Sequence, residues 1–192
     1  MKKLIASLFL GLTTVFAASA APVDLGSSAA GTPYDAYMRP VRQVLGSIDG
    51  NGVSMDRVRD LMRKGRNFRY VFDEPYVASL PHVTEARKSG DCKDKALWLA
   101  NQMGDENVRF VVGKARAVSD MSHAWLMWKN EGRWWILDCT NNSRPVAADS
   151  IARGEYVPLY SWSKRGVYRH GSADGLAASA VARKGRAPVG SR

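Results

Sequence analysis

The chain has 192 residues, of which 45% are hydrophobic and 24% are charged, and its formal net charge is +10. This composition is typical of one folded domain and excludes a wholly disordered chain. After the first twenty residues, no stretch reaches the roughly 18 apolar residues that a membrane-spanning helix needs, which excludes a polytopic membrane protein.

The positive charge is concentrated at the C-terminal end. Seven basic residues stand against one acidic residue between Lys164 and Arg192, whereas the segment from Ala21 to Ser163 carries a net charge of only +2. A basic segment rich in Ala, Gly and Ser has too few large apolar groups to fold alone. We therefore predict a basic disordered tail over residues 171–192, which could adhere weakly to an anionic envelope surface. Because the folded part is nearly neutral and carries no recognition motif, we do not expect nucleic-acid binding.

Residues 1–20 have the pattern of a signal peptide. Lys2 and Lys3 precede an apolar run, and the sequence Ala18-Ser19-Ala20 is an A-x-A cleavage site. We therefore expect the mature chain to begin near Ala21. A chain processed in this way would be periplasmic or secreted.

The N-terminal half predicts a leader followed by helices. Residues 21–31 are small and polar, which predicts a flexible leader, and the folded domain is expected over residues 32–170. A first helix is predicted from Thr32-Pro33, with Pro40 expected to kink or end it. A second helix is predicted from the cap residue Ser54.

The segment from Asp91 to Met103 predicts a buried central helix. Asp91 can cap its N-terminus, and Gly104 stands just past its end. An apolar stripe recurs at helical spacing, formed by Ala96, Leu99, Ala100 and Met103. Cys92 falls in the first turn, where unpaired N–H groups and the positive end of the helix dipole favour a thiolate.

The following segments predict antiparallel strands. Residues 108–115 predict one strand, and residues 122–129 and 133–139 predict a hairpin around Asn130-Glu131-Gly132. If Glu131 and Gly132 are the central turn residues, His123 and Asp138 share one face and are diagonal neighbours. A turn centred one residue earlier places them directly opposite, and a turn centred between the two puts them on opposite faces.

Beyond the hairpin, residues 141–154 predict a loop or a short helix. Residues 156–162 predict a strand, which we expect at the edge of the sheet because Pro158 cannot donate to a ladder on both sides. Order is expected to fade after about His170.

The residues Cys92, His123 and Asp138 follow one another in the order of a cysteine-nucleophile triad. A thiol needs a partner to become a thiolate near neutral pH, and an imidazole–carboxylate pair is the usual one. Each residue also has an ordinary alternative. Cys92 could form a disulfide with Cys139, His123 could be a core histidine, and Asp138 could cap the turn that follows it. Together they predict a nucleophile at a helix start, a base on one strand and an orienting carboxylate on the next.

At these residues the chain resembles a known family. Gly90-Asp91-Cys92-Lys93-Asp94, Ser122-His123-Ala124 and Leu137-Asp138 are similar to the motifs of the transglutaminase-like superfamily, and more narrowly of the bacterial transglutaminase-like cysteine proteinases of the LapG type. The resemblance extends over residues 54–170 and includes Asn67–Asp73 and Tyr156-Val157-Pro158.

The resemblance implies an α+β, papain-like core with the nucleophile on a central helix packed against an antiparallel sheet. It implies a thiol hydrolase that cleaves a peptide or isopeptide bond through a thioester, with a protein or peptide as substrate. Cys92 would be the nucleophile, His123 the general base and acid, and Asp138 the residue that orients His123. Two alternatives stay open, a catalytically inactive binding module of the same fold and a protein-crosslinking transglutaminase.

The resemblance also raises the question of calcium. Calcium-dependent members of the LapG type carry acidic residues on both sides of the nucleophile, whereas Lys93 follows Cys92 here. A lysine ammonium repels Ca²⁺, and Asp91 with Asp94 would be a thin ligand set. We therefore expect no metal site and no cofactor, with Asp91 acting as a helix cap.

Overall fold

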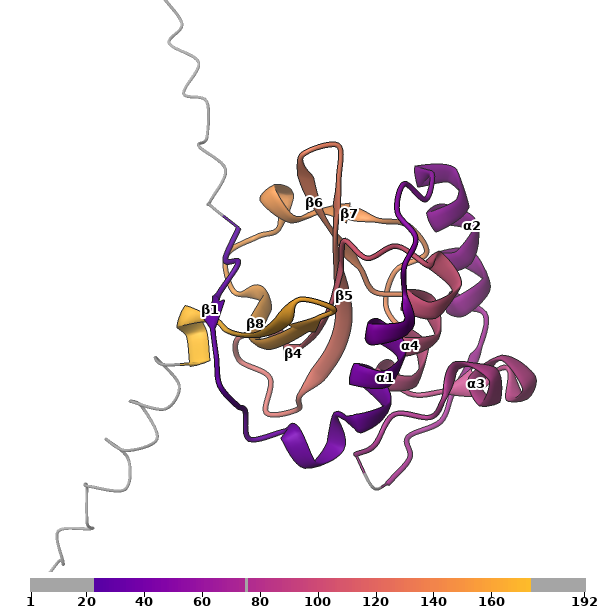
Figure 1. Ribbon diagram of the computed structural model, residues 1–192, viewed down its shortest axis with the longest axis horizontal. Coiled ribbons are helices and arrows are strands. Elements are labelled where there is room, and N and C mark those ends of the chain that lie inside the picture. Colours follow the sequence, from indigo (N-terminus) through magenta and orange to yellow (C-terminus); the bar gives the residue numbers. More distant parts are fainter. Residues whose placement is uncertain (1–22, 75, 174–192) are drawn as a thin grey trace, which may run out of the picture.

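The computed structural model describes residues 23–74 and 76–173, which form an α+β structure with the α-helices gathered on one side of a sheet (Figure 1). The α-helices are α1 (Arg39–Ser47), α2 (Met55–Arg66), α3 (Pro81–Arg87) and α4 (Cys92–Met103), and the 3-10 helices are η1 (Asp35–Tyr37) and η2 (Ala148–Ser150). The strands are β1 (Ser27–Ser28), β2 (Arg69–Tyr70), β3 (Ser89–Gly90), β4 (Val108–Arg116), β5 (His123–Asn130), β6 (Arg133–Leu137), β7 (Val146–Ala147), β8 (Glu155–Ser163) and β9 (Gly166–Arg169).

Two predicted segments fall outside this description. The signal peptide predicted over residues 1–20 and residues 174–192 of the predicted tail lie outside the described residues. Within the part that is described, no helix has the length and apolar character to cross a bilayer.

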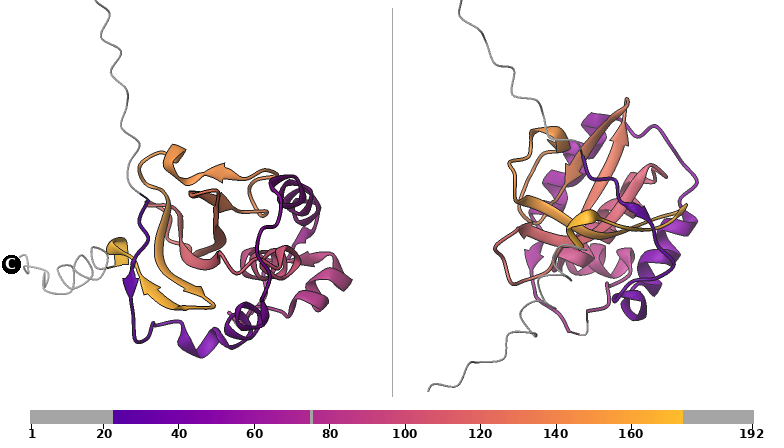
Figure 2. Two further views of the ribbon diagram at one scale, coloured as in Figure 1. Left: turned by 45° about the horizontal axis from the view of Figure 1, so that its top comes forward. Right: turned by 90° about the vertical axis from the view of Figure 1, so that its left-hand side faces the viewer.

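The main sheet has seven strands in the order β1-β9-β8-β4-β5-β6-β7, and every neighbouring pair is antiparallel. A separate parallel pair, β2 with β3, leads directly into α4. Figure 2 shows the N-terminal segment that carries β1 running beside β9, so the two ends of the described chain meet at one edge of the sheet.

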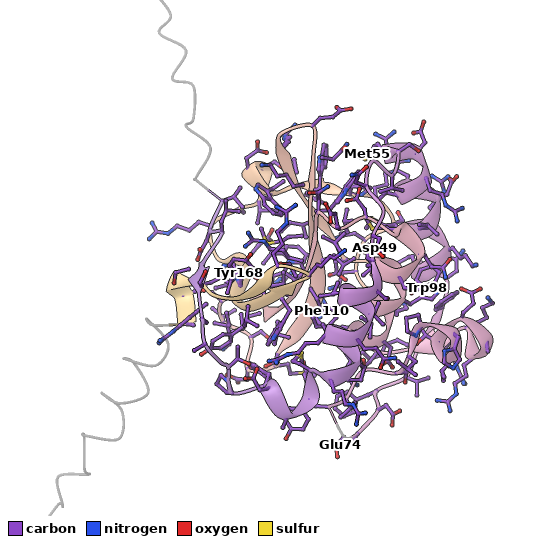
Figure 3. All side chains as sticks on the ribbon, viewed as in Figure 1. Asp49, Met55, Glu74, Trp98, Phe110 and Tyr168 are labelled. Atoms are coloured by element: carbon purple, nitrogen blue, oxygen red, sulfur yellow. The ribbon has the colours of Figure 1, made fainter. Side chains whose placement is uncertain are left out.

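Helix α4 is the central helix, as predicted. Asp91 is its N-cap, and Gly104 ends it in the left-handed conformation at φ 60°. Every residue from 92 to 100 is buried, because β5 and the other three α-helices surround α4. Trp98, labelled in Figure 3, packs on Phe68 with 4.8 Å between ring centroids and donates a hydrogen bond to Glu85.

The β5–β6 hairpin has the first of the three registers considered from the sequence. Leu126 lies opposite Leu137, and Glu131 and Gly132 are the two central turn residues. Both have positive φ, 49° and 77°, which is the requirement of a type I′ turn whose twist matches that of the strands. This register brings the start of β5 beside the residue that follows β6.

The prediction that residues 156–162 form an edge strand is wrong, because β8 lies between β4 and β9. Pro158 is tolerated inside the sheet because the β4–β8 register shifts between Val112 and Gly113, where Gly113 lies opposite Pro158. Glycine is needed there, since a Cβ on Gly113 would lie 2.2 Å from the carbonyl oxygen of Val157.

Two further expectations about the N-terminal part of the chain are corrected. Residues 23–31 are not a leader separate from the domain, because β1 adds to the sheet through β9. Pro40 does not end a helix but stands in the first turn of α1, where its fixed φ suits the helix start. At the other end of the described chain, His170 is fully buried, with Nε2 2.9 Å from Ser161 Oγ.

Candidate active site

Cys92 is the first residue of α4 and has 7% of its surface exposed. A capping box holds the helix start, in which Asp91 Oδ1 accepts from the N–H groups of Lys93 at 3.1 Å and Asp94 at 3.4 Å. Asp94 Oδ2 accepts in return from the N–H of Asp91 at 3.3 Å. The thiol therefore lies at the electropositive end of a rigidly capped, buried helix.

His123 and Asp138 form a close pair between β5 and the residue after β6. His123 Nε2 lies 2.8 Å from Asp138 Oδ2, and the side chains are 13% and 1% exposed. The imidazole is stacked on Trp125, with 6.0 Å between ring centroids. Because one nitrogen is engaged by Asp138, Nδ1 is the nitrogen left to face another partner.

Cys92 lies near the same imidazole, close enough to influence its pKa. Burial by itself lowers the pKa of His123, but the hydrogen bonds to Asp138 and Cys92 and the charges of both raise it to about 10. The structure thus brings the three sequence-predicted residues near one another.

Asp138 is held by groups that sequence reasoning missed. Tyr156 Oη donates to Oδ2 at 2.9 Å, Asn141 Nδ2 donates to the same oxygen at 2.8 Å, and the N–H of Thr140 donates to Oδ1 at 3.0 Å. Burial favours the neutral acid, but hydrogen bonding to His123 and these donors hold the pKa of Asp138 below its usual range. Asn141 could have been found from its place in the turn. Tyr156 belongs to the Tyr156-Val157-Pro158 segment of the family resemblance, but its contact with Asp138 could not be read from the sequence.

Cys139 does not take part in the site. Both cysteines are free, so the disulfide alternative is not realised. Cys139 is 2% exposed, and its Sγ lies 3.7 Å from the carbonyl oxygen of Lys95 inside the core. Burial raises the pKa of Cys139 to about 12, so it is a packed, inert thiol near neutral pH.

The helix start does not have the donor set of a metal site. Within the described residues, no group of three or more His, Cys, Asp and Glu side chains is placed to hold a metal ion. The Asp91 carboxylate is instead paired with the ammonium of Lys93, and both are buried.

A pocket of about 540 Å³ lies beside Asp138. Asn141 and Tyr156 line it and also contact Asp138; the other lining residues are Ala115, Arg116, Ser119, Asn142, Val146, Ile151 and Glu155. On the thiol side, Tyr70 is 49% exposed. The burial of the rest of its side chain and the nearby charge of Cys92 raise the pKa of Tyr70 to about 12.

Solved structures of Legionella pneumophila LapG are similar to this chain. One matches with a TM-score of 0.50 and 18% identity, covering 74% of this chain and 83% of LapG. A calcium-bound form matches with a TM-score of 0.50 and 20% identity over 66% of this chain and 74% of LapG. An EGTA-treated form has the same score and identity over 68% and 74%.

No family model and no curated protein sequence matches the chain. At 18–20% identity the likeness to LapG concerns the fold. The predicted α+β, papain-like and transglutaminase-like fold is therefore confirmed, and with it the resemblance to the fold of a transglutaminase-like cysteine proteinase.

Proposed function

We propose that the protein is an exported thiol hydrolase that cleaves a peptide or isopeptide bond through Cys92, His123 and Asp138. The observation that carries this proposal is the His123 imidazole, whose Nε2 lies 2.8 Å from Asp138 Oδ2 and whose pKa is raised by both Asp138 and the nearby Cys92. A histidine held in this way can store the thiol proton and release it toward a leaving group.

In the acylation step, the Cys92 thiolate attacks the carbonyl carbon of the scissile amide. The C–S bond forms, the carbonyl electrons move to oxygen, and the tetrahedral intermediate collapses as the C–N bond breaks. The His123 imidazolium gives its proton to the leaving nitrogen, so that a free amine departs and a thioester remains. Asp138 holds the imidazole tautomer and stabilises the cation that precedes this transfer.

In the deacylation step, His123 accepts a proton from water as the water oxygen attacks the thioester. The C–S bond breaks, a carboxylic acid leaves, and the thiolate–imidazolium pair is restored. The oxyanion of both steps needs N–H donors. The N–H of Cys92 has no acceptor within the part of the chain that the structure describes, because the cap Asp91 takes the next two N–H groups instead.

Calcium does not enter this mechanism. LapG has been solved in calcium-bound and EGTA-treated forms. In this chain the acidic residue before the nucleophile, Asp91, already carries the Lys93 ammonium as its counter-ion. The residues therefore do not fit a calcium site at this place, and no step is derived through the ion.

Proteins of this fold can have two other functions, and an experiment can distinguish these from hydrolysis. A crosslinking transglutaminase would use a lysine amine in place of water to resolve the thioester. A binding module would have no reactive thiol. The export pattern of residues 1–20 supports a periplasmic or secreted location and favours hydrolysis of an envelope protein or peptide, and the basic tail supports weak contact with an anionic surface.

The experiment is to incubate the purified protein with a pool of peptides in ¹⁸O-labelled water that also contains a fluorescent primary amine. Hydrolysis predicts ¹⁸O in newly formed carboxyl groups, whereas crosslinking predicts amine attached to peptide side chains. Cys92→Ala should abolish the product, and Cys139→Ala is the matched control that should retain it. The absence of any product, or equal product from Cys92→Ala, would contradict the hydrolase proposal.

A further inference from the structure

The two residues that flank the nucleophile form a buried ion pair. Asp91 is 1% exposed and Lys93 is 2% exposed, and the Lys93 ammonium donates to Asp91 Oδ2. A buried charge is costly unless it is paired and hydrogen-bonded. An ion pair that brackets Cys92 at this depth is therefore part of how the site is built, unlike the exposed pairs on the helix surfaces.

The Lys93 ammonium also reaches the segment that leads from β2 to α3. Nζ donates to the carbonyl oxygen of Asp73 at 3.2 Å and lies 5.5 Å from the centroid of the Tyr76 ring. Burial is the main cause that raises the pKa of Tyr76, and the charge of the nearby Cys92 is the next one. One cation thus ties the helix start to the backbone and an aromatic side chain beside the thiol.

Each of the four carboxylate oxygens of Asp91 and Asp94 already accepts a hydrogen bond. Asp91 uses Oδ1 for the cap and Oδ2 for Lys93, while Asp94 uses Oδ1 for the N–H of Ser79 at 2.7 Å and Oδ2 for the N–H of Asp91. A calcium ion requires about six to eight oxygen ligands and would have to displace an ammonium of like charge.

We infer that Lys93 is a built-in counter-ion and positioning residue that assembles the nucleophile's helix start without calcium. This inference rests on the proposed role of Cys92. The ammonium neutralises Asp91, so the carboxylate can cap α4 without placing an uncompensated negative charge beside the thiolate. It also holds the segment around Asp73 and Tyr76 against that helix start.

The test measures the rate of Cys92 alkylation at one fixed pH, by peptide mapping, together with the thermal midpoint. For the wild type, neither excess EGTA nor added calcium chloride should change either quantity. Loss of reactivity in EGTA that calcium restores would overturn the inference.

Charge variants supply the second arm. Lys93→Met should slow Cys92 alkylation about tenfold and lower the thermal midpoint, because the Asp91 charge is left unpaired beside the thiolate. The double variant Asp91→Asn/Lys93→Met should recover most of the rate, since asparagine still caps the helix and no charge is left. Lys129→Met, at an exposed lysine of β5, is the matched control and should match the wild type.

The outcomes separate this inference from the proposed function. Equal alkylation rates for wild type and Lys93→Met, or no recovery in the double variant, would overturn the counter-ion role. If Lys93→Met fails to fold, the double variant and the measurements with EGTA and calcium chloride still test the inference. If Cys92 is reactive and insensitive to calcium but the protein hydrolyses no peptide, the hydrolase proposal is contradicted and this inference is supported.

Discussion

His123 Nε2 lies 2.8 Å from Asp138 Oδ2, although His123 begins β5 and Asp138 follows the last residue of β6. The type I′ turn at Glu131 and Gly132 sets the register that makes the two diagonal neighbours on one face. A slip of one position would carry one of the two side chains to the other face of the sheet. A two-residue turn therefore decides whether the carboxylate can orient the imidazole.

Replacing Asp138 with Asn should lower the kcat for hydrolysis by about 10³- to 10⁴-fold, because an amide cannot hold the same imidazole tautomer or stabilise its cation. The side-chain oxygen that remains can still accept from the N–H of Thr140, so folding should be retained. Asp149→Asn, at an exposed partner of Arg133, is the control and should leave kcat unchanged. A loss below tenfold at Asp138 would argue against its role.

The raised pKa of His123 predicts a pH-dependent part of the stability. The pKa rises from 6.5 for an ordinary histidine to about 10 in the folded protein, so the folded state binds this proton more tightly. The stabilisation is fully present below pH 6.5 and is lost as the pH rises through 10. The free energy of unfolding, from urea titrations across this window, should fall more for the wild type than for His123→Gln.

The control for this series is His82→Gln, which changes an exposed histidine on α3 and should follow the wild type. Parallel profiles for wild type and His123→Gln would show that the imidazole gains no proton affinity on folding.

The two cysteines should differ sharply in reactivity. Cys139 is buried and its pKa is raised to about 12, whereas Cys92 stands at a helix start beside an imidazole. Iodoacetamide should therefore label Cys92 alone in the folded protein and both thiols in urea, as read by mass spectrometry of peptides. Cys139→Ala should not change Cys92 labelling. Comparable labelling of both thiols in the native state, or a Cys92–Cys139 disulfide, would refute this prediction.

Gly113→Ala should be destabilising by about 1–3 kcal/mol, because the new Cβ would meet the carbonyl oxygen of Val157 at 2.2 Å and neither backbone can move freely inside the sheet. Gly113 also lies opposite His123 in the ladder, so hydrolysis should fall as well. Gly46→Ala is the matched control. It has nothing within 4 Å in α1 and should stabilise the protein by up to about 1 kcal/mol in urea unfolding. Equal effects at the two sites would contradict the close approach.

Glu131→Asn should raise the free energy of unfolding by about 1 kcal/mol. Glu131 has φ 49°, a left-handed conformation that is costly for most residues but tolerated by asparagine, and Asn-Gly is the preferred pair for a type I′ turn. Chemical denaturation measures the gain, with Glu155→Asn in a strand as comparison. A decrease would indicate that Glu131 makes interactions that outweigh its backbone cost.

The central helix and the β5–β6 hairpin follow from local pattern and were predicted correctly, whereas the α-helix predicted from Thr32-Pro33 begins at Arg39. The Asp91 cap, the Gly104 end and the apolar stripe between them define α4, because capping and periodicity act within a few residues. The β5–β6 hairpin follows in the same way from its turn. The inner position of β8 did not follow, since it depends on Gly113 of a strand more than forty residues away.

The amino-acid sequence by itself determined the order of Cys92, His123 and Asp138, and it predicted the helix start that carries Cys92 and the strand that carries His123, because helix caps, turns and alternation depend on neighbouring residues. Asp138 was predicted on a strand, but it follows the last residue of β6. The tertiary structure alone decided what surrounds these three residues. Tyr156 reaches Asp138 from β8, and Lys93 is buried against Asp91 and the segment at Asp73. The free-energy cost of a buried charge depends on how deeply it is buried and on how near its partners lie. Both depend on segments that are remote in sequence, so a local sequence pattern does not predict them.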